Sequence, residues 1–154
     1  MIFSLEGKTA VITGAAGYFG DSFCKALLDF GCNIILLGRG NKILNKTTKY
    51  ETEYGDGRAC YKLVDFYDDK KFQTTLEEIV AEHDVDILIN NAYEFGPNTG
   101  FGQDGRLDSI PKEKFMRSLE SGVWWPMLAT QVIGEHMKER KTGSIINISS
   151  MYGI

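Results

Sequence analysis

Three glycines follow a short β-type run near the start of the chain. The run covers residues 9–13, TAVIT, and the glycines are Gly14, Gly17 and Gly20. The amphipathic segment 21–30 comes next and predicts a helix. This order suits a dinucleotide, because glycines admit a pyrophosphate close to the backbone and a helix N-terminus offers unpaired N–H groups. An ordinary turn is the alternative, since glycines also mark turns without a ligand.

Residues that can bind or react follow four other apolar runs. Short aliphatic runs without alternation are typical of buried strands in a parallel sheet. Gly38 and Arg39 follow the run 33–37, and Asp65 follows the run 59–64. Asn90, Asn91 and Ala92 follow the run 85–89, and Ser149 and Ser150 follow the run 144–148. Because the carboxyl ends of parallel strands meet at one edge, where ligands bind, these residues are expected to share a site with the glycine turn.

Helical segments separate these runs. Periodicity predicts further helices over residues 43–54, 68–83, 111–119 and 121–140. Gly31 and Gly143 are expected at helix ends, and Pro126 is expected early in the last helix or at a kink in it. The pattern stops at residues 93–110, a glycine-rich loop whose length suggests a functional or mobile segment. Strands alternating with helices imply an α/β fold with a parallel sheet and right-handed crossovers.

The composition is that of an ordinary globular protein. The 154 residues are 43% hydrophobic and 25% charged, with a formal net charge of −4, and they favour one domain over 1–154. No basic stripe indicates nucleic acid, no apolar run could span a bilayer, and no secretory signal is visible, so a cytoplasmic protein is expected. Cys24, Cys32 and Cys60 lack metal-ligand spacing, and no metal site is expected. His83 and His136 are expected to be solvated or to lie at helix ends.

Four motifs together resemble the short-chain dehydrogenase/reductase family over essentially the whole chain. They are Thr13-Gly14 with Gly17 and Gly20, Asp65, Asn90-Asn91-Ala92, and the sequence GSIINISS at 143–150. The resemblance implies a Rossmann-type doubly wound parallel sheet that binds NAD(P) and an activity that interconverts an alcohol and a carbonyl. The sequences TGAAGYFG and GSIINISSMYG further resemble bacterial oxidoreductases associated with flagellin modification and nonulosonic acid synthesis.

The resemblance implies cofactor contacts for Gly14, Ala15, Gly17, Tyr18, Phe19, Gly20, Arg39, Asp65, Phe66, Asn91 and Ala92. Asp65 matches the family's adenine-binding aspartate; the alternative is a helix cap, although Asp68 lies nearer that place. Asn90 and Ala92 match a motif that steadies the central sheet and lines the cofactor ribose.

The end of the second strand predicts a preference for NADP over NAD. NAD-specific members generally carry an acidic residue there, whereas this chain has Gly38 and then Arg39. A guanidinium is a planar, permanently charged fork that suits the extra phosphate of NADP. The alternative is that Arg39 is a solvated loop residue.

Ser150 matches the family's catalytic serine, whose hydroxyl polarises the substrate carbonyl. Side chains alternate along a strand, so only one of Ser149 and Ser150 faces the site, and Ser150 is favoured. In the family, a Tyr-x-x-x-Lys pair that acts as general acid/base lies a dozen or more residues later. That pair is absent here, and Tyr152 is no substitute.

The family domain is longer, with two more strands and a substrate-binding region. The chain is therefore expected to be an N-terminal portion or a truncated product, cut after the fifth strand of the sheet. Such a chain would lack reductase activity alone. It would also leave Ile145, Ile146 and Ile148 on an uncovered apolar edge.

Three positions depart from the family pattern. Tyr18 stands where single-domain members have their middle glycine, so the spacing T-G-x-x-G-x-x-G is more like the extended, nucleotide-sugar branch. Tyr93 replaces the glycine that usually follows Asn-Asn-Ala. Gly122 falls where the family has the asparagine of a proton relay, with Glu120 or Ser121 as substitutes if the alignment shifts.

Three functions remain open from the sequence. The leading hypothesis is an NAD(P)-dependent oxidoreductase for a small-molecule alcohol or carbonyl, such as a sugar or sugar nucleotide. A nucleotide-sugar epimerase or dehydratase would regenerate its cofactor, and a non-catalytic dinucleotide-binding module would bind without turnover. Family members usually form dimers or tetramers through the long helix, so a homo-oligomer is expected of the full-length protein. Trp124 and Trp125 are either interface or core residues.

Overall fold

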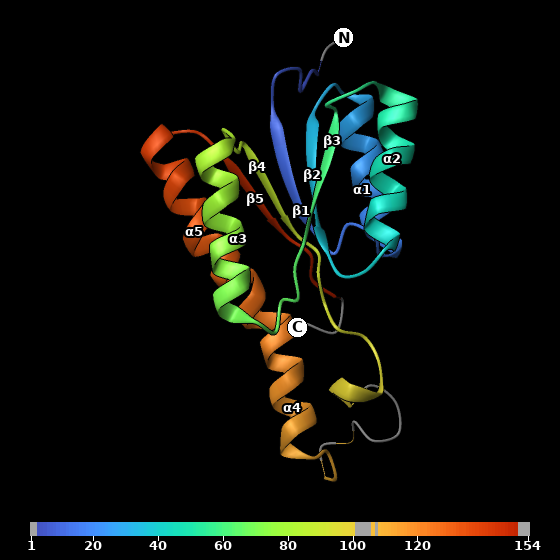
Figure 1. Ribbon diagram of the computed structural model, residues 1–154. Helices are drawn as coiled ribbons and strands as arrows, with labels where there is room; N and C mark the ends of the chain where they lie inside the picture. Colours follow the sequence, from blue (N-terminus) through green and yellow to red (C-terminus); the bar gives the residue numbers. More distant parts are fainter. Residues whose placement is uncertain (1–2, 101–105, 107, 151–154) are drawn as a thin grey trace.

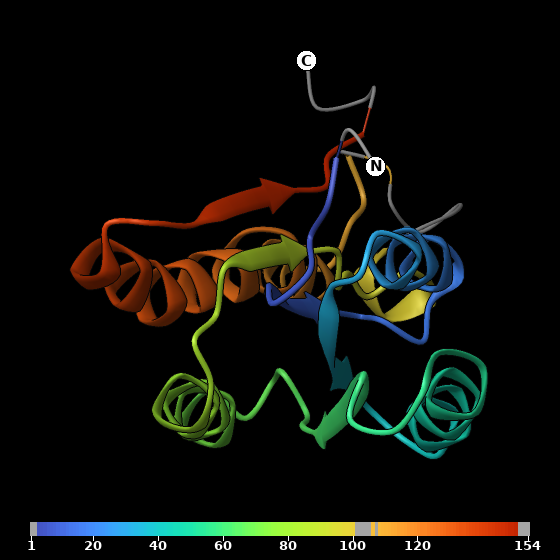
Figure 2. The same ribbon diagram turned by 90° about the horizontal axis from the view of Figure 1, so that it is seen from above.

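The computed structural model describes residues 3–100, 106 and 108–150. Its strands are β1 (Thr9–Thr13), β2 (Asn33–Gly38), β3 (Ala59–Leu63), β4 (Ile87–Asn90) and β5 (Ser144–Asn147). Its helices are α1 (Tyr18–Asp29), α2 (Lys42–Tyr54), α3 (Asp69–Glu82), α4 (Lys112–Leu119) and α5 (Trp125–Arg140). All strands pair in parallel in the order β3-β2-β1-β4-β5, with α1 and α2 on one face and α3 and α5 on the other (Figure 1; Figure 2). The predicted Rossmann-type doubly wound parallel sheet is confirmed.

The central strands enter two hydrophobic cores with alternate residues. Val11 of β1 belongs to the core formed with α3 and α5, whereas Ala10 and Ile12 belong to the core formed with α1 and α2. β2 divides in the same way, with Leu36 and Leu37 in opposite cores. Both faces of these strands are therefore covered, which explains their continuous apolar sequences.

Helix α1 begins at Tyr18, three residues before the predicted start. Gly17 is its N-cap, with an extended backbone (φ −75°, ψ 179°), so Gly20 lies in the first helical turn. Glycine has a low helix propensity, which is why the sequence pattern places the boundary too late. At the other end, Gly31 adopts φ 90° after the cap residue Phe30, as expected of a helix C-terminus.

The two helices predicted over 111–119 and 121–140 form one continuous helical segment. A π-helical turn, Glu120–Trp124, joins α4 to α5. Pro126 lies in the first turn of α5, directly after the π turn. Proline has no N–H to donate and clashes with the carbonyl four residues earlier in a regular α-helix, and a wider turn relieves both problems.

The end of α5 matches the predicted range, but the residue that caps it does not. The helix ends at Arg140 and is capped by Lys141 in the left-handed conformation (φ 56°), so Gly143 does not end it. Gly143 instead lies against the helix, because a Cβ there would be 2.5 Å from Met137 Cγ. The glycine permits a close approach of the chain on its way into β5.

Strand β5 forms one edge of the sheet in the described part of the chain. Ile146 and Ile148 are 44% and 41% exposed, which confirms the expected apolar edge for these two residues. The expectation is wrong for Ile145, which is partly buried and packs on the core formed with α3 and α5. Alternation along the strand directs it to the opposite face from Ile146.

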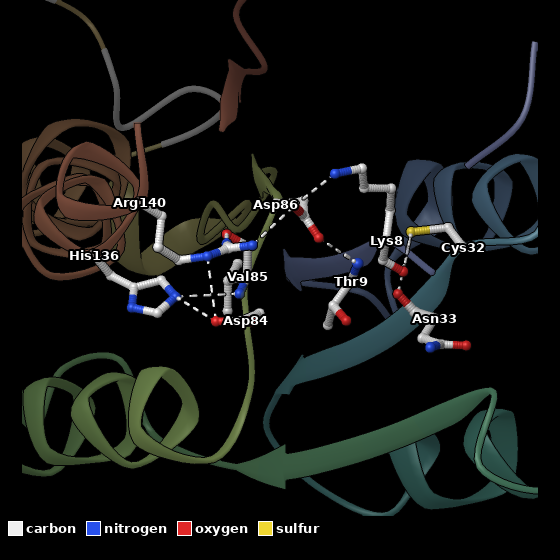
Figure 3. Close-up of polar contacts among 9 residues, drawn as sticks. All are labelled: Lys8, Thr9, Cys32, Asn33, Asp84, Val85, Asp86, His136 and Arg140. Carbon is white, nitrogen blue, oxygen red and sulfur yellow. Dashed lines mark hydrogen bonds and ion pairs between the residues drawn. The ribbon is translucent and has the colours of Figure 1, made fainter. Parts of the chain in front are cut away.

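A buried carboxylate ties the amino ends of β1 and β4 to the end of α5 (Figure 3). Asp86 accepts hydrogen bonds from Lys8 Nζ (3.0 Å), the Thr9 N–H (3.1 Å) and Arg140 Nη2 (3.3 Å). Burial opposes ionisation, but the Thr9 N–H and the Lys8 ammonium outweigh it, so the pKa of Asp86 is lowered. This cluster lies at the opposite end of the strands from the glycine turn.

Candidate functional site

The glycine turn lies where the strand order reverses, at the carboxyl end of β1. β2 pairs with one edge of β1 and β4 with the other, so the segments after all three strands converge there (Figure 1). The Gly14 N–H donates to the Leu37 carbonyl and the Gly17 N–H to the Gly14 carbonyl, both at 2.9 Å. Among the residues that the structure describes, no side chain caps the N-terminus of α1, so first-turn N–H groups are available to an anion.

Two of the glycines are required by close backbone contacts. Gly14 has φ 64°, and a Cβ on it would lie 2.8 Å from Ala92 Cα. A Cβ on Gly20 would lie 2.5 Å from the Gly14 carbonyl oxygen. The glycine turn is therefore a tightly packed backbone cradle, in which a side chain at Gly14 or Gly20 would clash with the protein itself.

Thr13 and Asn91 hold the glycine turn against the segment after β4. Thr13 Oγ1 accepts the N–H groups of Asn91 and Ala92, both at 3.0 Å, and donates to the Ile89 carbonyl at 3.4 Å. The Asn91 side-chain amide donates to the Thr13 carbonyl (3.2 Å) and the Gly14 carbonyl (3.1 Å). The Asn91 NH₂ group therefore supports the cradle from behind.

Arg39 and Asp65 lie together at the same edge. They follow β2 and β3, which are neighbours in the sheet, and Arg39 Nη1 is 3.6 Å from Asp65 Oδ1. Both side chains are about half exposed, at 48% and 55%. Asp65 is not the cap of α3, because Asp68 holds that position and accepts the Lys71 N–H at 3.0 Å.

Four other candidate cofactor residues differ sharply in exposure. Ala15 is fully buried and Phe66 is 4% exposed, with its ring 4.8 Å from that of Phe72, so only their backbones can reach a ligand. Tyr18 is 91% exposed and Phe19 is 60% exposed at the start of α1.

Asn90 joins three elements beneath the site. Its Nδ2 donates to Asn147 Oδ1 of β5 (2.8 Å) and to Thr130 Oγ1 of α5 (3.3 Å). The side chain is buried, so it acts within the protein rather than on a ligand. The arrangement agrees with the sheet-steadying role expected for this residue.

Tyr93 and Gly122, two residues that depart from the family pattern, contact each other. The ring of Tyr93 lies over Gly122, where a Cβ would be 3.5 Å from Tyr93 Cε2. The Tyr93 hydroxyl is hydrogen bonded to Ser118 Oγ at 3.1 Å. Of the two alternative relay residues, Ser121 is fully buried and donates to the Ser118 carbonyl. Burial and the nearby Asp69 charge raise the pKa of Glu120.

A carboxylate that the sequence analysis did not single out anchors the loop after β4 to α4. Glu94 accepts Arg117 Nε (2.5 Å) and Nη2 (3.3 Å) and the Tyr67 hydroxyl. The Arg117 guanidinium lies 3.8 Å from the centre of the Tyr67 ring. Burial opposes ionisation of Glu94, but these donors outweigh it and lower its pKa. No local pattern could reveal the cluster, because its members are 23 to 50 residues apart.

Ser149 and Ser150 follow β5 at the same carboxyl edge, and both are exposed. Ser150 therefore lies after the carboxyl end of β5, the strand next to β4, and the glycine turn lies at the same edge of the sheet. Tyr152 lies outside the described residues.

The remaining candidates have structural roles. Trp125 is core, at 3% exposed, and the indole N–H of Trp124 donates to Asp69 Oδ1 at 2.8 Å. His83 caps α3, whereas His136 lies within α5 and accepts the Val85 N–H at 3.3 Å, so it is neither solvated nor at a helix end. The three cysteines are free thiols, and burial raises the pKa of each.

Neither a metal cluster nor a membrane helix is found in the part of the chain that the structure describes. No group of three or more His, Cys, Asp or Glu side chains among those residues could hold a metal ion. None of their helices is both long and apolar enough to cross a bilayer.

Comparison with known proteins gives consistent matches. Residues 8–154 match the sequence model of the family described as short chain dehydrogenase. The chain is 30% identical over 149 residues to 2-dehydro-3-deoxy-D-gluconate 5-dehydrogenase of Bacillus subtilis (strain 168), covering 97% of this chain and 55% of that protein. The chain therefore spans about half the length of this curated relative.

Two solved structures share the fold. L-sorbose reductase from Gluconobacter frateurii, complexed with NADPH and L-sorbose, matches with a TM-score of 0.85 at 23% identity. The match covers 98% of this chain and 55% of the reductase chain. A gluconate 5-dehydrogenase from Burkholderia cenocepacia J2315, in complex with NADP and tartrate, has a TM-score of 0.81 at 24% identity, with coverages of 96% and 55%.

Proposed function

The chain belongs to the short-chain dehydrogenase/reductase family, and we propose that it is the dinucleotide-binding domain of an NADP(H)-dependent oxidoreductase. The observation that carries the proposal is the uncapped N-terminus of α1 above a cradle of crowded glycines. Backbone N–H groups and the helix dipole favour an anion there, and the close backbone contacts at Gly14 and Gly20 hold the turn in this conformation. The domain is taken to cover 1–154.

The residues at the carboxyl edge of the sheet suggest how the cofactor is held. First-turn N–H groups of α1 would bind the pyrophosphate, and the backbone at Ala92 would line the ribose. Asp65 would accept from the adenine amino group. Arg39 would bind the 2′-phosphate that distinguishes NADP from NAD, leaving its ion pair with Asp65 to do so. Relatives solved with NADP or NADPH support this preference.

The chemistry proposed is the interconversion of an alcohol and a carbonyl. Nicotinamide supplies or accepts the hydride. Ser150 is the catalytic residue in this chain, and its hydroxyl would donate to the substrate oxygen. The part of this chemistry assigned to these 154 residues is binding of the cofactor and the Ser150 hydroxyl.

A polyhydroxy acid or sugar is the substrate class that the relatives favour. The names of three of them refer to a deoxygluconate, a gluconate and L-sorbose. The narrower resemblance to flagellin-modification enzymes stays a prediction. An epimerase or a non-catalytic module has no observation in its favour beyond the spacing at Tyr18 and the substitutions at Tyr93 and Gly122.

Self-association is proposed for the full-length protein. Five apolar side chains of the helical segment 112–127 are 41–59% exposed: Phe115, Met116, Leu119, Val123 and Met127. They form an apolar stripe along α4, the π turn and the start of α5. A stripe of this kind is typical of a surface that packs against another helix.

Calorimetric titration of the chain with NADPH and NADH tests the proposed function. Wild-type protein is expected to bind NADPH at least tenfold more tightly, because Arg39 pairs with the 2′-phosphate. Arg39→Ala should remove this preference and leave NADH affinity within about twofold. Lys70→Ala, which removes an equal charge from the exposed surface of α3, is the matched control and should change neither affinity.

Two results would count against this assignment. No binding of either dinucleotide would contradict the proposed function as a whole. Equal affinities for NADPH and NADH in wild-type protein would leave dinucleotide binding standing but remove the role given to Arg39.

A further inference from the structure

Helix α4 packs less closely on the protein than the other helices do. None of its eight residues, Lys112–Leu119, is buried. Its larger apolar side chains, Phe115, Met116 and Leu119, are 41–50% exposed. Segments with few buried apolar contacts open locally at a lower free energy than the core of a protein. Local opening of α4 is therefore an equilibrium that a few contacts can shift.

One cluster ties α4 to the segments that follow β3 and β4. Arg117 of α4 donates to Glu94 through Nε (2.5 Å) and Nη2 (3.3 Å), and its guanidinium lies 3.8 Å from the centre of the Tyr67 ring. The Tyr67 hydroxyl donates to the same carboxylate, whose side chain is only 12% exposed. Charge-assisted hydrogen bonds that are shielded from water are strong, so Glu94 is a firm anchor for the helix.

The other end of this cluster reaches residues assigned to the cofactor. The Tyr67 N–H donates to Asp65 Oδ1 at 3.3 Å, and Asp65 is the residue proposed to accept from the adenine amino group. Glu94 lies two residues after Ala92, whose backbone is proposed to line the ribose. A continuous series of contacts therefore connects the adenine and ribose positions to α4.

We propose that dinucleotide binding at the carboxyl edge of the sheet is coupled to the local opening of α4 through the Tyr67–Glu94–Arg117 cluster. The inference rests on the proposed function. A bound dinucleotide would restrict the segments that carry Asp65 and Ala92, and Tyr67 and Glu94 with them. Both partners of Arg117 are then already ordered, so closing α4 costs less conformational entropy and its opening becomes rarer.

The coupling gives the bound cofactor an influence on the surface of the domain. Phe115, Met116 and Leu119 belong to the apolar stripe proposed for self-association, and all three lie on α4. A domain loaded with dinucleotide would present this part of the stripe in an ordered form. Arg117 and Glu94 are positioning residues, since they act on α4 and not on the ligand.

Hydrogen exchange of residues 112–119, measured by mass spectrometry with and without saturating NADPH, tests the coupling. Wild-type α4 is expected to exchange about fivefold more slowly in the loaded protein, a factor at the low end of typical coupling between sites. Arg117→Met keeps a long side chain and a good helix former but removes the guanidinium. In this variant NADPH should change the exchange of α4 by less than about twofold, while the glycine turn is protected as in the wild type.

Two further variants complete the test. Lys112→Met removes an equal charge from an exposed position of the same helix, and NADPH should protect its α4 as in the wild type. Tyr67→Phe removes one hydroxyl without changing α4 itself, and it should also reduce the effect of NADPH to less than about twofold. It decides alone if Arg117→Met does not fold. A purely structural role of Arg117 would speed exchange in the free protein but leave the effect of NADPH unchanged.

The outcomes separate this inference from the proposed function. Protection of the glycine turn by NADPH with no change in wild-type α4 overturns the coupling and leaves the proposed function intact. A full effect of NADPH on α4 in Tyr67→Phe or in folded Arg117→Met also overturns it, because the cluster would then not carry the coupling. If NADPH protects no segment of the wild-type chain, both proposals fall.

Discussion

At the scale of single residues, Thr13 connects the two halves of the sheet at the site. Its hydroxyl accepts from two consecutive N–H groups and donates to a carbonyl of β4, and the side chain is 4% exposed. The sequence indicated Thr13 only as part of a motif. Its partners are 76 to 79 residues away, so no local pattern could show what the hydroxyl binds.

Thr13→Val keeps the shape of the side chain and removes the hydroxyl. The N–H groups of Asn91 and Ala92 would lose their acceptor, and we expect the free energy of unfolding to fall by about 2 kcal/mol. NADPH affinity should fall as well, because the glycine turn loses its support. Urea unfolding and calorimetric titration measure the two effects.

Thr47→Val is the matched control for this substitution. Thr47 is also 4% exposed, but its hydroxyl donates only to the Ile43 carbonyl one turn earlier in α2. Removing it leaves no N–H without a partner, so the loss should stay below about 1 kcal/mol. Similar losses for the two variants would contradict the role given to Thr13.

The sequence located the glycine turn, Arg39 and Asp65 because each follows a strand that its own apolar pattern identifies. It did not reveal that Arg39 and Asp65 are within 3.6 Å of each other, which depends on the sheet order. It also did not reveal that the Tyr93 ring covers Gly122, since that contact joins a loop to a π turn 29 residues later.

At the scale of elements, most predicted bounds match the structure to within one residue, and the main exceptions are the starts of α1, β4 and α5. Strand β4 covers Ile87–Asn90 rather than 85–89, so Asn90 ends the strand instead of following it. β1 and β2 are short, continuous apolar runs, and their observed bounds match the prediction to within one residue. The start of α1 at Tyr18 depends on the extended backbone of Gly17, and α5 is capped by a left-handed Lys141 rather than ended by Gly143. Both are local backbone choices that hydrophobic periodicity does not encode.

The Asp86 cluster makes the anchoring of β1, β4 and α5 depend on pH. The pKa of Asp86 in the folded protein is lowered from 3.8, so its contribution to stability is fully present above that value and is lost as the pH falls through the lower, folded-state pKa. Asp86→Asn should lower the free energy of unfolding by about 3 kcal/mol at pH 7. The difference from wild type should shrink below about pH 4.

Asp84→Asn is the control for the pH series. Asp84 pairs with Arg140 Nε at 3.2 Å, but its side chain is 79% exposed. Its removal should cost less than about 1 kcal/mol at pH 7. Urea unfolding across the pH series measures both variants, and an Asp86→Asn deficit that is as large at pH 3 as at pH 7 would refute the pH dependence.

At the scale of the whole molecule, the doubly wound sheet collects the strand ends into one site. Alternating strands and helices predicted a parallel sheet with its strand ends at one edge, and the family resemblance supplied the doubly wound arrangement that the strand order confirms. Hydrophobic periodicity could not predict which apolar side chains of the helices are exposed. The apolar stripe of α4 and the π turn became visible only once the exposure of each side chain was known.

Self-association through this stripe is open to a direct test. Leu119→Glu with Val123→Glu places two charges on the exposed apolar surface without entering the core. Sedimentation velocity of the full-length protein at micromolar concentration should show an oligomer for the wild type and a monomer for the double variant, while Tyr61→Glu on β3 should leave the oligomer intact. An oligomer that survives in the double variant would exclude this surface as the interface.

The most direct test of the central claim is hydrogen exchange of the chain with and without saturating NADPH. The account predicts added protection at the glycine turn and the start of α1, at Gly38 and Arg39, and at the segment after β4. The competing place for an anion is the hollow between β3 and α3, which is lined by Lys62, Lys70 and Lys71. Protection confined to that hollow, or no change anywhere, would contradict a dinucleotide site at the carboxyl edge of the sheet.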